Sequence, residues 1–388
     1  MELSGNWNYP TQYHFGAGRI RTLAESAVAQ GMTAPLVVTD PGIAALGFLQ
    51  EIVVSLQASG LKPALFSDVK PNPTGKNIDA GAIAYREGEH DGVIAVGGGS
   101  ALDAGKAIAL VCMQNRPLWD FVDEGDNWAR VQANLVPPII AVPTTAGTGS
   151  EVGRASVILD EEANTKRIIF HPKMMPGLVV ADPELTVGLP ANLTAATGID
   201  ALAHNLEAYC APGYHPMAEG ISVEGMRLIK AWLPNAVADG SDIEARSHML
   251  VASSMGATAF QRGLGGIHAL AHPLGALYDA HHGLLNAILM PYVLVANRPA
   301  IDGIITDLTR SLGFPKSGFD TFLDWILELR RDLAIPHTLA SIGIGDRDAV
   351  KVGTMAEVDP TASTNPIRFT AVEYAEIFRM SVEGKLLR

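Results

Sequence analysis

The sequence predicts two domains: an α/β domain with a parallel sheet in residues 1–189, and an all-helical domain in residues 190–388. In the first part, short apolar runs alternate with helical stretches, which is typical of parallel strands covered by helices on both faces. From about residue 190 the apolar periodicity becomes 3.6 residues, with few β-branched clusters. A chain of 388 residues is long enough for two domains of ordinary size.

The individual elements follow in order along the chain. In the α/β part we expect strands at 35–40, 62–69 and 91–99 and a fourth that enters a Gly/Thr loop within 137–151, with helices at 46–60 and 100–113. This alternation predicts a Rossmann-like arrangement of βαβ units. In the second part we expect helices around 198–209, 218–233 and 320–335.

The composition indicates an enzyme that acts on small molecules in the cytoplasm. Hydrophobic residues make up 48% of the chain and charged residues 18%, and no apolar run reaches the length of a membrane span. The formal net charge of −13 argues against a nucleic-acid or anionic-membrane surface. Residues 1–16 lack the pattern of a signal peptide, and the two cysteines do not suggest a disulfide framework.

Two windows rich in histidine predict a metal site. Asp200 and His204 are four residues apart in one apolar window, and His268 and His272 repeat this spacing in the next, followed by the pair 281–282. In a helix this spacing places both side chains on one face. A single histidine is more often structural than a ligand, but several polar groups buried together need partners. A metal held only by nitrogen and oxygen ligands suits Fe²⁺, Zn²⁺ or Mn²⁺ in a catalytic role.

Two loops indicate a dinucleotide-binding site. Glycines follow the strand VIAV at 97–99, where backbone N–H groups and a helix N-terminus can bind a pyrophosphate. The standard GxGxxG spacing is absent, and Ser100 is also a good N-cap. A second loop, 142–151, supplies hydroxyls. Asp40 ends a strand, where it would bind an adenosine ribose and favour NAD over NADP, or it belongs to an ordinary Asp-Pro-Gly turn.

Together these strings resemble the iron-containing, group III alcohol dehydrogenases. The resemblance spans the chain and is carried by GGGSALDAGKA, PTTAGTGSE, ADPELT, LPANLTAATGIDALAHNLEAY, GLGGIHALAHPLGALYDAHHGLLNAILMPYV and TNPIRFT. It implies an α/β dinucleotide-binding domain followed by a helical metal-binding domain. By this resemblance the metal ligands are Asp200, His204, His268 and His282.

The resemblance also implies roles for other residues. His272 matches a histidine that is not a ligand and is a proton-relay candidate. His281 stands where the family usually has Pro, so it would compete with His282 or line the mouth of the pocket. The implied cofactor-binding residues are Asp40, Gly98, Gly99, Ser100, Asp103, Thr144, Thr145, Thr148 and Lys166.

The reaction that follows is hydride transfer between NAD(H) and a short-chain alcohol or aldehyde, with a divalent metal, Fe²⁺ or else Zn²⁺, as Lewis acid. Arg154 and Arg262 stand beside the motifs and would hold an anionic tail, as in 4-hydroxybutyrate and succinic semialdehyde, unless both form ordinary ion pairs. The alternatives are a general primary-alcohol or lactaldehyde/1,2-propanediol-type dehydrogenase, a dehydroquinate-synthase-like lyase, and a non-catalytic NAD- or metal-binding protein. The resemblance further implies a homodimer or a higher homo-oligomer.

Overall fold

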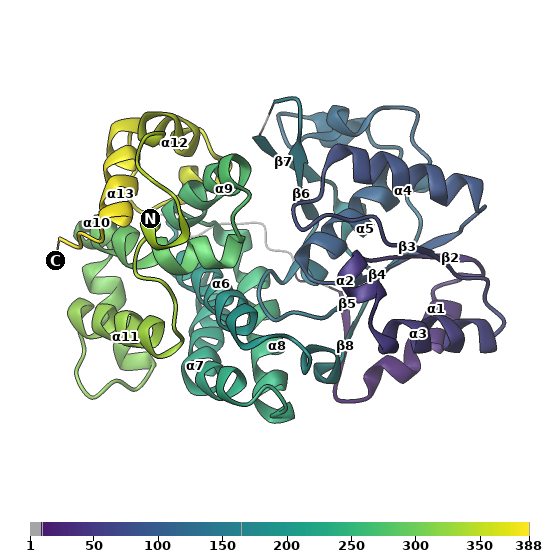
Figure 1. The fold of residues 1–388 in the computed structure, drawn as a ribbon, viewed down its shortest axis with the longest axis horizontal. Coiled ribbons are helices and arrows are strands. Elements are labelled where there is room, and N and C mark those ends of the chain that lie inside the picture. The colour runs from purple at the N-terminus through teal and green to yellow at the C-terminus, as the bar shows by residue number, and fades with distance from the viewer. Residues whose placement is uncertain (1–8, 10, 164, 388) are drawn as a thin grey trace. The chain divides into compact units, whose positions relative to one another are not determined.

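The structure is a computed structural model that describes residue 9 and residues 11–163 and 165–387. The described residues form two compact units, Tyr9–Gly188 (the α/β unit) and the part from Leu189 onward (the helical unit). Both units are drawn in Figure 1. Residues 1–8, on which the expectation of no signal peptide partly rests, lie outside the described residues.

A six-stranded sheet forms the centre of the α/β unit. Its order is β1-β8-β5-β4-β2-β3, and every neighbouring pair is parallel. The strands are β1 (Gln12–Phe15), β2 (Pro35–Val38), β3 (Ala64–Phe66), β4 (Gly92–Gly97), β5 (Ile139–Pro143) and β8 (Leu178–Ala181). The predicted parallel sheet is therefore confirmed. The expected strand 62–69 is shorter than predicted.

Helices cover both faces of this sheet. Val38 and Val93 pack with α4 (Gly75–Glu87) and α5 (Gly99–Val111), whereas Val37 and Ile94 pack with α1 (Leu23–Ala29) and α3 (Gly47–Ala58). Because side chains alternate along a strand, the two sets lie on opposite faces. The strand order reverses between β2 and β4, and in open α/β sheets ligands bind where the carboxyl ends of the strands flank such a reversal.

An antiparallel hairpin, β6 (Ala155–Asp160) and β7 (Thr165–Phe170), lies outside the main sheet. Its register pairs Leu159 with Lys166. The short helix α2 (Pro41–Ala44) follows β2. This hairpin was not predicted from the sequence.

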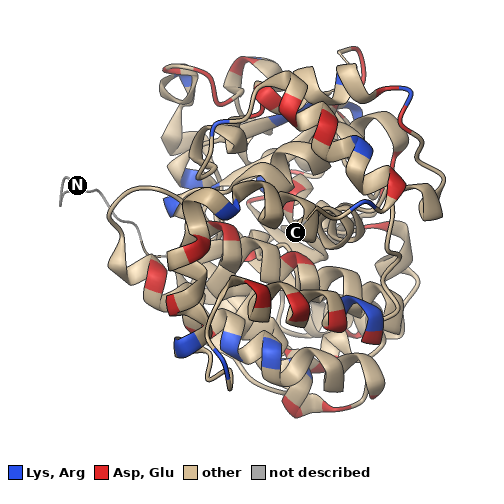
Figure 2. Cartoon of the chain, turned by 90° about the vertical axis from the view of Figure 1, so that its left-hand side faces the viewer, with Lys and Arg blue, Asp and Glu red and all other residues tan. Residues whose placement is uncertain are grey.

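In the helical unit, all the regular elements of the described residues are helices. They are α6 (Ala191–Cys210), α7 (Pro216–Ala238), α8 (Ile243–Ala259), α9 (Gly266–Tyr278), α10 (His282–Ser311), α11 (Phe319–Asp332), α12 (Ala349–Glu357) and α13 (Ala371–Glu383), with short 3₁₀ turns between some of them. Acidic and basic residues are interspersed along the helices seen in Figure 2.

Helix α6 is at the centre of this unit, because it packs against α7, α8 and α10. Small residues allow this close approach: a Cβ on Gly198 would lie 2.2 Å from a Leu233 methyl group, and one on Gly256 would lie 2.9 Å from Cβ of His204. Consequently most polar side chains of α6, among them Asp200, His204 and Glu207, are buried, and each buried one needs a partner.

Helix α10 is also a core helix. It has 30 residues and is apolar and long enough to cross a membrane by composition alone, but 67% of its apolar window is buried inside the protein. Burial of this extent is typical of a core helix in a globular unit. Its apolar character therefore reflects packing within the helical unit.

Candidate metal centre and cofactor loops

Four candidate metal ligands converge in the helical unit. Asp200 and His204 lie one turn apart on α6, His268 lies on α9, and His282 begins α10. The Oδ1 atom of Asp200 is 3.9 Å from Nε2 of His204, 3.9 Å from Nε2 of His268 and 3.8 Å from Nε2 of His282. The ligand atoms of the first three residues all lie within 4.8 Å of one another, and all three are buried. Three imidazoles and a carboxylate suit Fe²⁺ or Zn²⁺.

Asn286, one turn after His282, places a hydrogen-bond donor among the candidate ligand atoms. Its Nδ2 donates to Asp200 Oδ1 at 2.7 Å and lies 3.2 Å from Nε2 of both His268 and His282. Its Oδ1 is buried and has no hydrogen-bond partner among the described residues. A weakly positive amide group thus lies where acceptor atoms converge, at the cost of an unsatisfied oxygen. The donor set fits a divalent cation.

His272 contacts the ligand cluster but has a partner of its own. Its Nδ1 is 2.8 Å from Asp359 Oδ2, and its ring stacks on His282 with centroids 5.5 Å apart. Burial alone would raise the pKa of Asp359, but His272 and the Thr361 donors lower it below the ordinary value. The charged form of Asp359 therefore holds the His272 ring.

His281, whose role the sequence left open, caps a helix. It is the N-cap residue of α10, and its Nδ1 accepts a hydrogen bond from the Leu284 N–H at 3.3 Å. It is exposed, whereas three of the four candidate ligands are buried. This contact favours a capping role for His281 over competition with His282.

Two loops meet at the carboxyl ends of β4 and β5 in the α/β unit. A Cβ on Gly99 would lie 2.5 Å from Thr148 Oγ1, and one on Gly98 would lie 3.2 Å from Thr145 Cγ2. The Thr144 N–H donates to the Gly97 carbonyl at 3.0 Å, which ties the loops together. Gly98 is the N-cap of α5 and provides no side-chain cap, so the first N–H groups of α5 can bind an anion.

Asp40 lies two residues after the end of β2, next to the same loops. Its Oδ1 accepts a hydrogen bond from the Ile43 N–H at 3.0 Å and caps α2. A Cβ on Gly97 would lie 3.5 Å from Oδ2 of Asp40, and no hydrogen bond to Oδ2 is found among the described residues. Asp40 therefore uses Oδ1 in the turn, while its Oδ2 can still accept a hydrogen bond from a ligand.

Two other expected cofactor residues, Asp103 and Ser100, have internal contacts. Asp103 is buried, and it accepts from Ser150 Oγ at 2.5 Å and from the Val157 N–H at 2.9 Å, with Lys106 Nζ 3.2 Å away. Ser100 Oγ donates to the Pro71 carbonyl. Lys166 is half-buried on β7. These contacts favour a role for Asp103 in fixing the loop after β5 to α5.

Comparison with known proteins identifies the family. Residues 10–183 match the profile of the iron-containing alcohol dehydrogenases, and residues 194–382 match that of the C-terminal part of the same family. The chain belongs to the iron-containing alcohol dehydrogenase family. It is 38% identical to a 4-hydroxybutyrate dehydrogenase of Cupriavidus necator over 384 residues, which cover 96% of this chain and 99% of that protein.

Solved structures agree with this assignment. The crystal structure of a 1,3-propanediol oxidoreductase matches with a TM-score of 0.90 and 34% identity, covering 97% of this dehydrogenase and all of that chain. A sulfoacetaldehyde reductase from Bifidobacterium kashiwanohense, solved with NAD⁺, matches with a TM-score of 0.89 and 27% identity over 98% of this chain and 99% of that one. The predicted fold class and family are thus confirmed.

Membership settles the reaction class and the cofactors. The chain is an oxidoreductase that acts on a CH–OH group, and its cofactors are NAD(H) and a divalent metal, iron being the family's metal. This result removes two alternatives, the dehydroquinate-synthase-like lyase and the non-catalytic binding protein.

The two arginines of this dehydrogenase have different surroundings. Arg262 donates to the carbonyls of Ala208, Tyr209 and Gly213 and forms a 2.8 Å ion pair with Glu219. These contacts tie it to the end of α6 and favour a structural role. The Arg154 guanidinium lies 5.5 Å from the Phe170 ring centroid, and no ion pair of Arg154 is found among the described residues.

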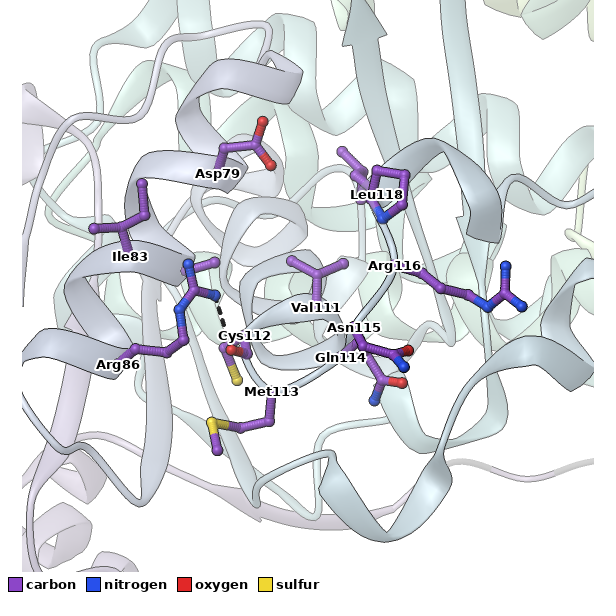
Figure 3. Close-up of a pocket in the computed structure, with 12 residues that line it drawn as sticks. Asp79, Ile83, Arg86, Val111, Cys112, Met113, Gln114, Asn115, Arg116 and Leu118 are labelled. Carbon is purple, nitrogen blue, oxygen red and sulfur yellow. Dashed lines mark hydrogen bonds between the residues drawn. The ribbon is translucent and has the colours of Figure 1, made fainter.

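A surface groove lies between α4 and the end of α5 (Figure 3). Its lining includes Arg86, Cys112 and Met113. Helix α5 has 13 residues and is therefore about 20 Å long, which separates this groove from the loops at the helix N-terminus. Burial raises the pKa of the Cys112 thiol to about 12, which disfavours the thiolate form that a reactive cysteine needs. We assign no cofactor role to this groove.

Three residues near the metal cluster were not predicted from the sequence, namely Glu207, Asn286 and Asp359. Glu207 follows His204 by three residues on α6, and Asn286 follows His282 by four on α10. Helical spacing from a ligand is a local signal that would have found both. Asp359 lies 87 residues from His272 in the sequence, so no local pattern connects them.

Gly99→Ala is expected to weaken NADH binding about tenfold or more, because a Cβ so close to Thr148 forces the two loops apart. The affinity is measured by NADH fluorescence titration of the full-length protein. The matched control is Gly47→Ala: Gly47 is also the first residue of a helix, α3, but its Cβ would meet nothing within 4 Å. Equal NADH affinity in both variants would contradict the assignment of these loops to the cofactor.

Proposed function

We propose that this chain interconverts a short primary alcohol and its aldehyde, with the metal held by Asp200, His204, His268 and His282. The observation that carries the proposal is the buried cluster in which Nε2 of three histidines lies 3.8–3.9 Å from one carboxylate oxygen. We further propose that the α/β unit binds NAD(H) through a set of loop and strand residues. They are Asp40, Gly98, Gly99, Ser100, Thr144, Thr145, Thr148 and Lys166, with Asp103 fixing the loop.

The protein's own residues prepare this reaction. A divalent metal held by Asp200 and the three histidines would supply Lewis-acid polarisation of the substrate oxygen, and NAD(H) would supply or accept the hydride. The N-terminal N–H groups of α5 would bind the pyrophosphate, and Asp40 Oδ2 would be the acceptor for the ribose. His272, whose Nδ1 is held by Asp359, keeps Nε2 for exchanging the substrate proton with solvent.

For the substrate, we propose a short aldehyde or alcohol with a carboxylate or similar anionic tail. Arg154 ends the loop that carries the three threonines, and among the described residues its guanidinium has no carboxylate partner. Such a guanidinium can bind a carboxylate bidentately. The 4-hydroxybutyrate dehydrogenase relative supports a substrate of the 4-hydroxybutyrate type. The structural contacts of Arg262 leave Arg154 as the candidate anion-binding residue.

An uncharged alcohol or diol is the alternative substrate. The 1,3-propanediol oxidoreductase supports it, and a neutral substrate would need no cation. A lactaldehyde/1,2-propanediol-type activity belongs to the same alternative. Comparing rates on charged and uncharged aldehydes distinguishes these substrates.

Arg154→Ala is expected to lower kcat/KM for succinic semialdehyde by about 10- to 100-fold, because a charged hydrogen bond contributes about 1.5–3 kcal/mol. With propanal the change is expected to be within about twofold, since no charge is recognised. NADH consumption by the anaerobic, Fe²⁺-reconstituted protein is measured with both aldehydes. Arg154→Lys is the control and should keep part of the preference. Equal losses with both aldehydes would contradict the anionic substrate.

We also infer a cytoplasmic location and a homodimer or higher homo-oligomer. Both cysteines, Cys112 and Cys210, are free and buried, which agrees with a reducing compartment. Light scattering at micromolar concentration tests the assembly, and the mass of a monomer would contradict it.

A further inference from the structure

Glu207 joins the metal cluster to the start of α9. It lies on α6 and is 7% exposed. Its Oε1 accepts from the Ile267 N–H at 2.7 Å, and its Oε2 accepts from the Gly265 N–H at 2.9 Å. The same Oε2 is 2.6 Å from Nδ1 of His268. One buried carboxylate therefore contacts both the backbone N–H groups at the start of α9 and the imidazole ring of His268.

These contacts fix which nitrogen of His268 carries the proton. Backbone N–H groups can only donate, so both oxygens of Glu207 must act as acceptors. Consequently Nδ1 of His268 must donate to Oε2, and Nε2 is left with its lone pair. This Nε2 is the atom that lies 3.9 Å from Asp200 Oδ1. Only a nitrogen with a free lone pair can bind a metal.

We propose that Glu207 is a positioning residue of the metal centre, which holds His268 in the tautomer and orientation that a metal ligand needs. The proposal rests on the proposed function through its ligand set. Glu207 does not touch the metal or the substrate, and it acts through His268. A helix cap alone would not require the hydrogen bond to Nδ1.

A matched pair one turn further along α9 provides the control. Nδ1 of His272 is held by Asp359 Oδ2 at 2.8 Å, and Asp359 Oδ1 accepts from the Thr361 N–H at 2.9 Å. Each histidine thus has a carboxylate partner that also accepts from a backbone N–H, Glu207 being buried and Asp359 partly buried. In the proposed ligand set His268 binds the metal and His272 does not, so the two carboxylates should differ in their effect on metal affinity.

Glu207→Gln is expected to lower the Zn²⁺ affinity of the metal-depleted, full-length protein by about 10- to 100-fold. The amide is of equal size, but its NH₂ group can donate to Nδ1 of His268, which moves the ring proton to Nε2 and removes the lone pair. Asp359→Asn is expected to change the affinity by less than about twofold, because His272 is not a ligand. The affinity is measured by competition with a chromogenic chelator.

Three results would distinguish an error in the ligand set from an error in the role of Glu207. Parent-like Zn²⁺ affinity in His268→Ala would overturn the ligand set and with it the proposed metal site. Loss of affinity in His268→Ala, together with parent-like affinity in Glu207→Gln, would overturn only the role of Glu207. Equal losses in Glu207→Gln and Asp359→Asn would likewise overturn it.

Should Glu207→Gln fail to fold, the unchanged protein provides the test. In ¹H–¹⁵N spectra of its Zn²⁺-loaded form, His268 is expected to carry the proton on Nδ1 and the metal on Nε2. The opposite arrangement would overturn the proposal.

Discussion

Asp200→Asn is expected to lower turnover by at least about 1,000-fold, since a metal acting as Lewis acid supplies several kcal/mol of transition-state stabilisation. Asp200 is the one carboxylate among the candidate ligands, and all three imidazole Nε2 atoms lie within 3.9 Å of its Oδ1. Its amide replacement keeps the size but loses the negative charge. Iron content after reconstitution should therefore fall together with turnover, whereas NADH affinity should remain near that of the parent.

Asp242→Asn is the matched control for this substitution. Asp242 is also in the helical unit, where it caps α8 by accepting from the Ala245 N–H at 2.9 Å. Asparagine caps helices as well as aspartate does, so stability, iron content and turnover should all stay close to those of the parent. A parent-like iron content in Asp200→Asn would contradict the assignment of Asp200 as a ligand.

Local periodicity was enough to predict the general fold. The strand VIAV and the helix after it were predictable because a short, fully apolar run ends at glycines where the helix begins. The hairpin β6–β7 was missed, although its burial alternates along β6, because its charged residues interrupt the apolar pattern. The exact ends of the strands could not be predicted from the sequence either, because they depend on pairing with neighbouring strands. Strand β3, which has only three residues, is an example.

For the metal site, the sequence showed which residue types recur at helical spacing. It did not show what surrounds them. Helical spacing can point to Asn286 and Glu207, but their contacts are determined only when α6, α9 and α10 pack together, because each contacts a residue from another helix. The same limit applies to Arg262. It is adjacent to a conspicuous motif in the sequence, but its side chain donates hydrogen bonds to carbonyl groups near the C-terminal end of α6. Proximity along the chain is thus a weak guide to what a long, charged side chain contacts.

Gly283→Ala is expected to weaken metal binding about tenfold or more. It should also destabilise the fold by about 1–3 kcal/mol, which is the usual cost of overpacking a core. Gly283 follows His282 on α10, where a Cβ would lie 2.6 Å from the Ala196 carbonyl oxygen and 3.2 Å from Cβ of Asp200. Backbone atoms of α6 cannot turn aside as a flexible side chain does. Helix α10 must therefore move away from α6, which separates His282 from Asp200. Zn²⁺ affinity and thermal unfolding of the metal-depleted protein measure the two effects.

Gly303→Ala provides the control on the same helix. Gly303 is exposed on α10, and a Cβ there would meet nothing within 4 Å. Alanine at such a site restricts the unfolded chain and should stabilise the protein by about 0.4–1 kcal/mol without changing metal affinity. The two substitutions are chemically identical and differ only in what the new methyl group meets. If Gly283→Ala lowered the unfolding temperature but left Zn²⁺ affinity unchanged, His282 would not depend on the close approach of α10 to α6, and its assignment as a ligand would lose its structural support.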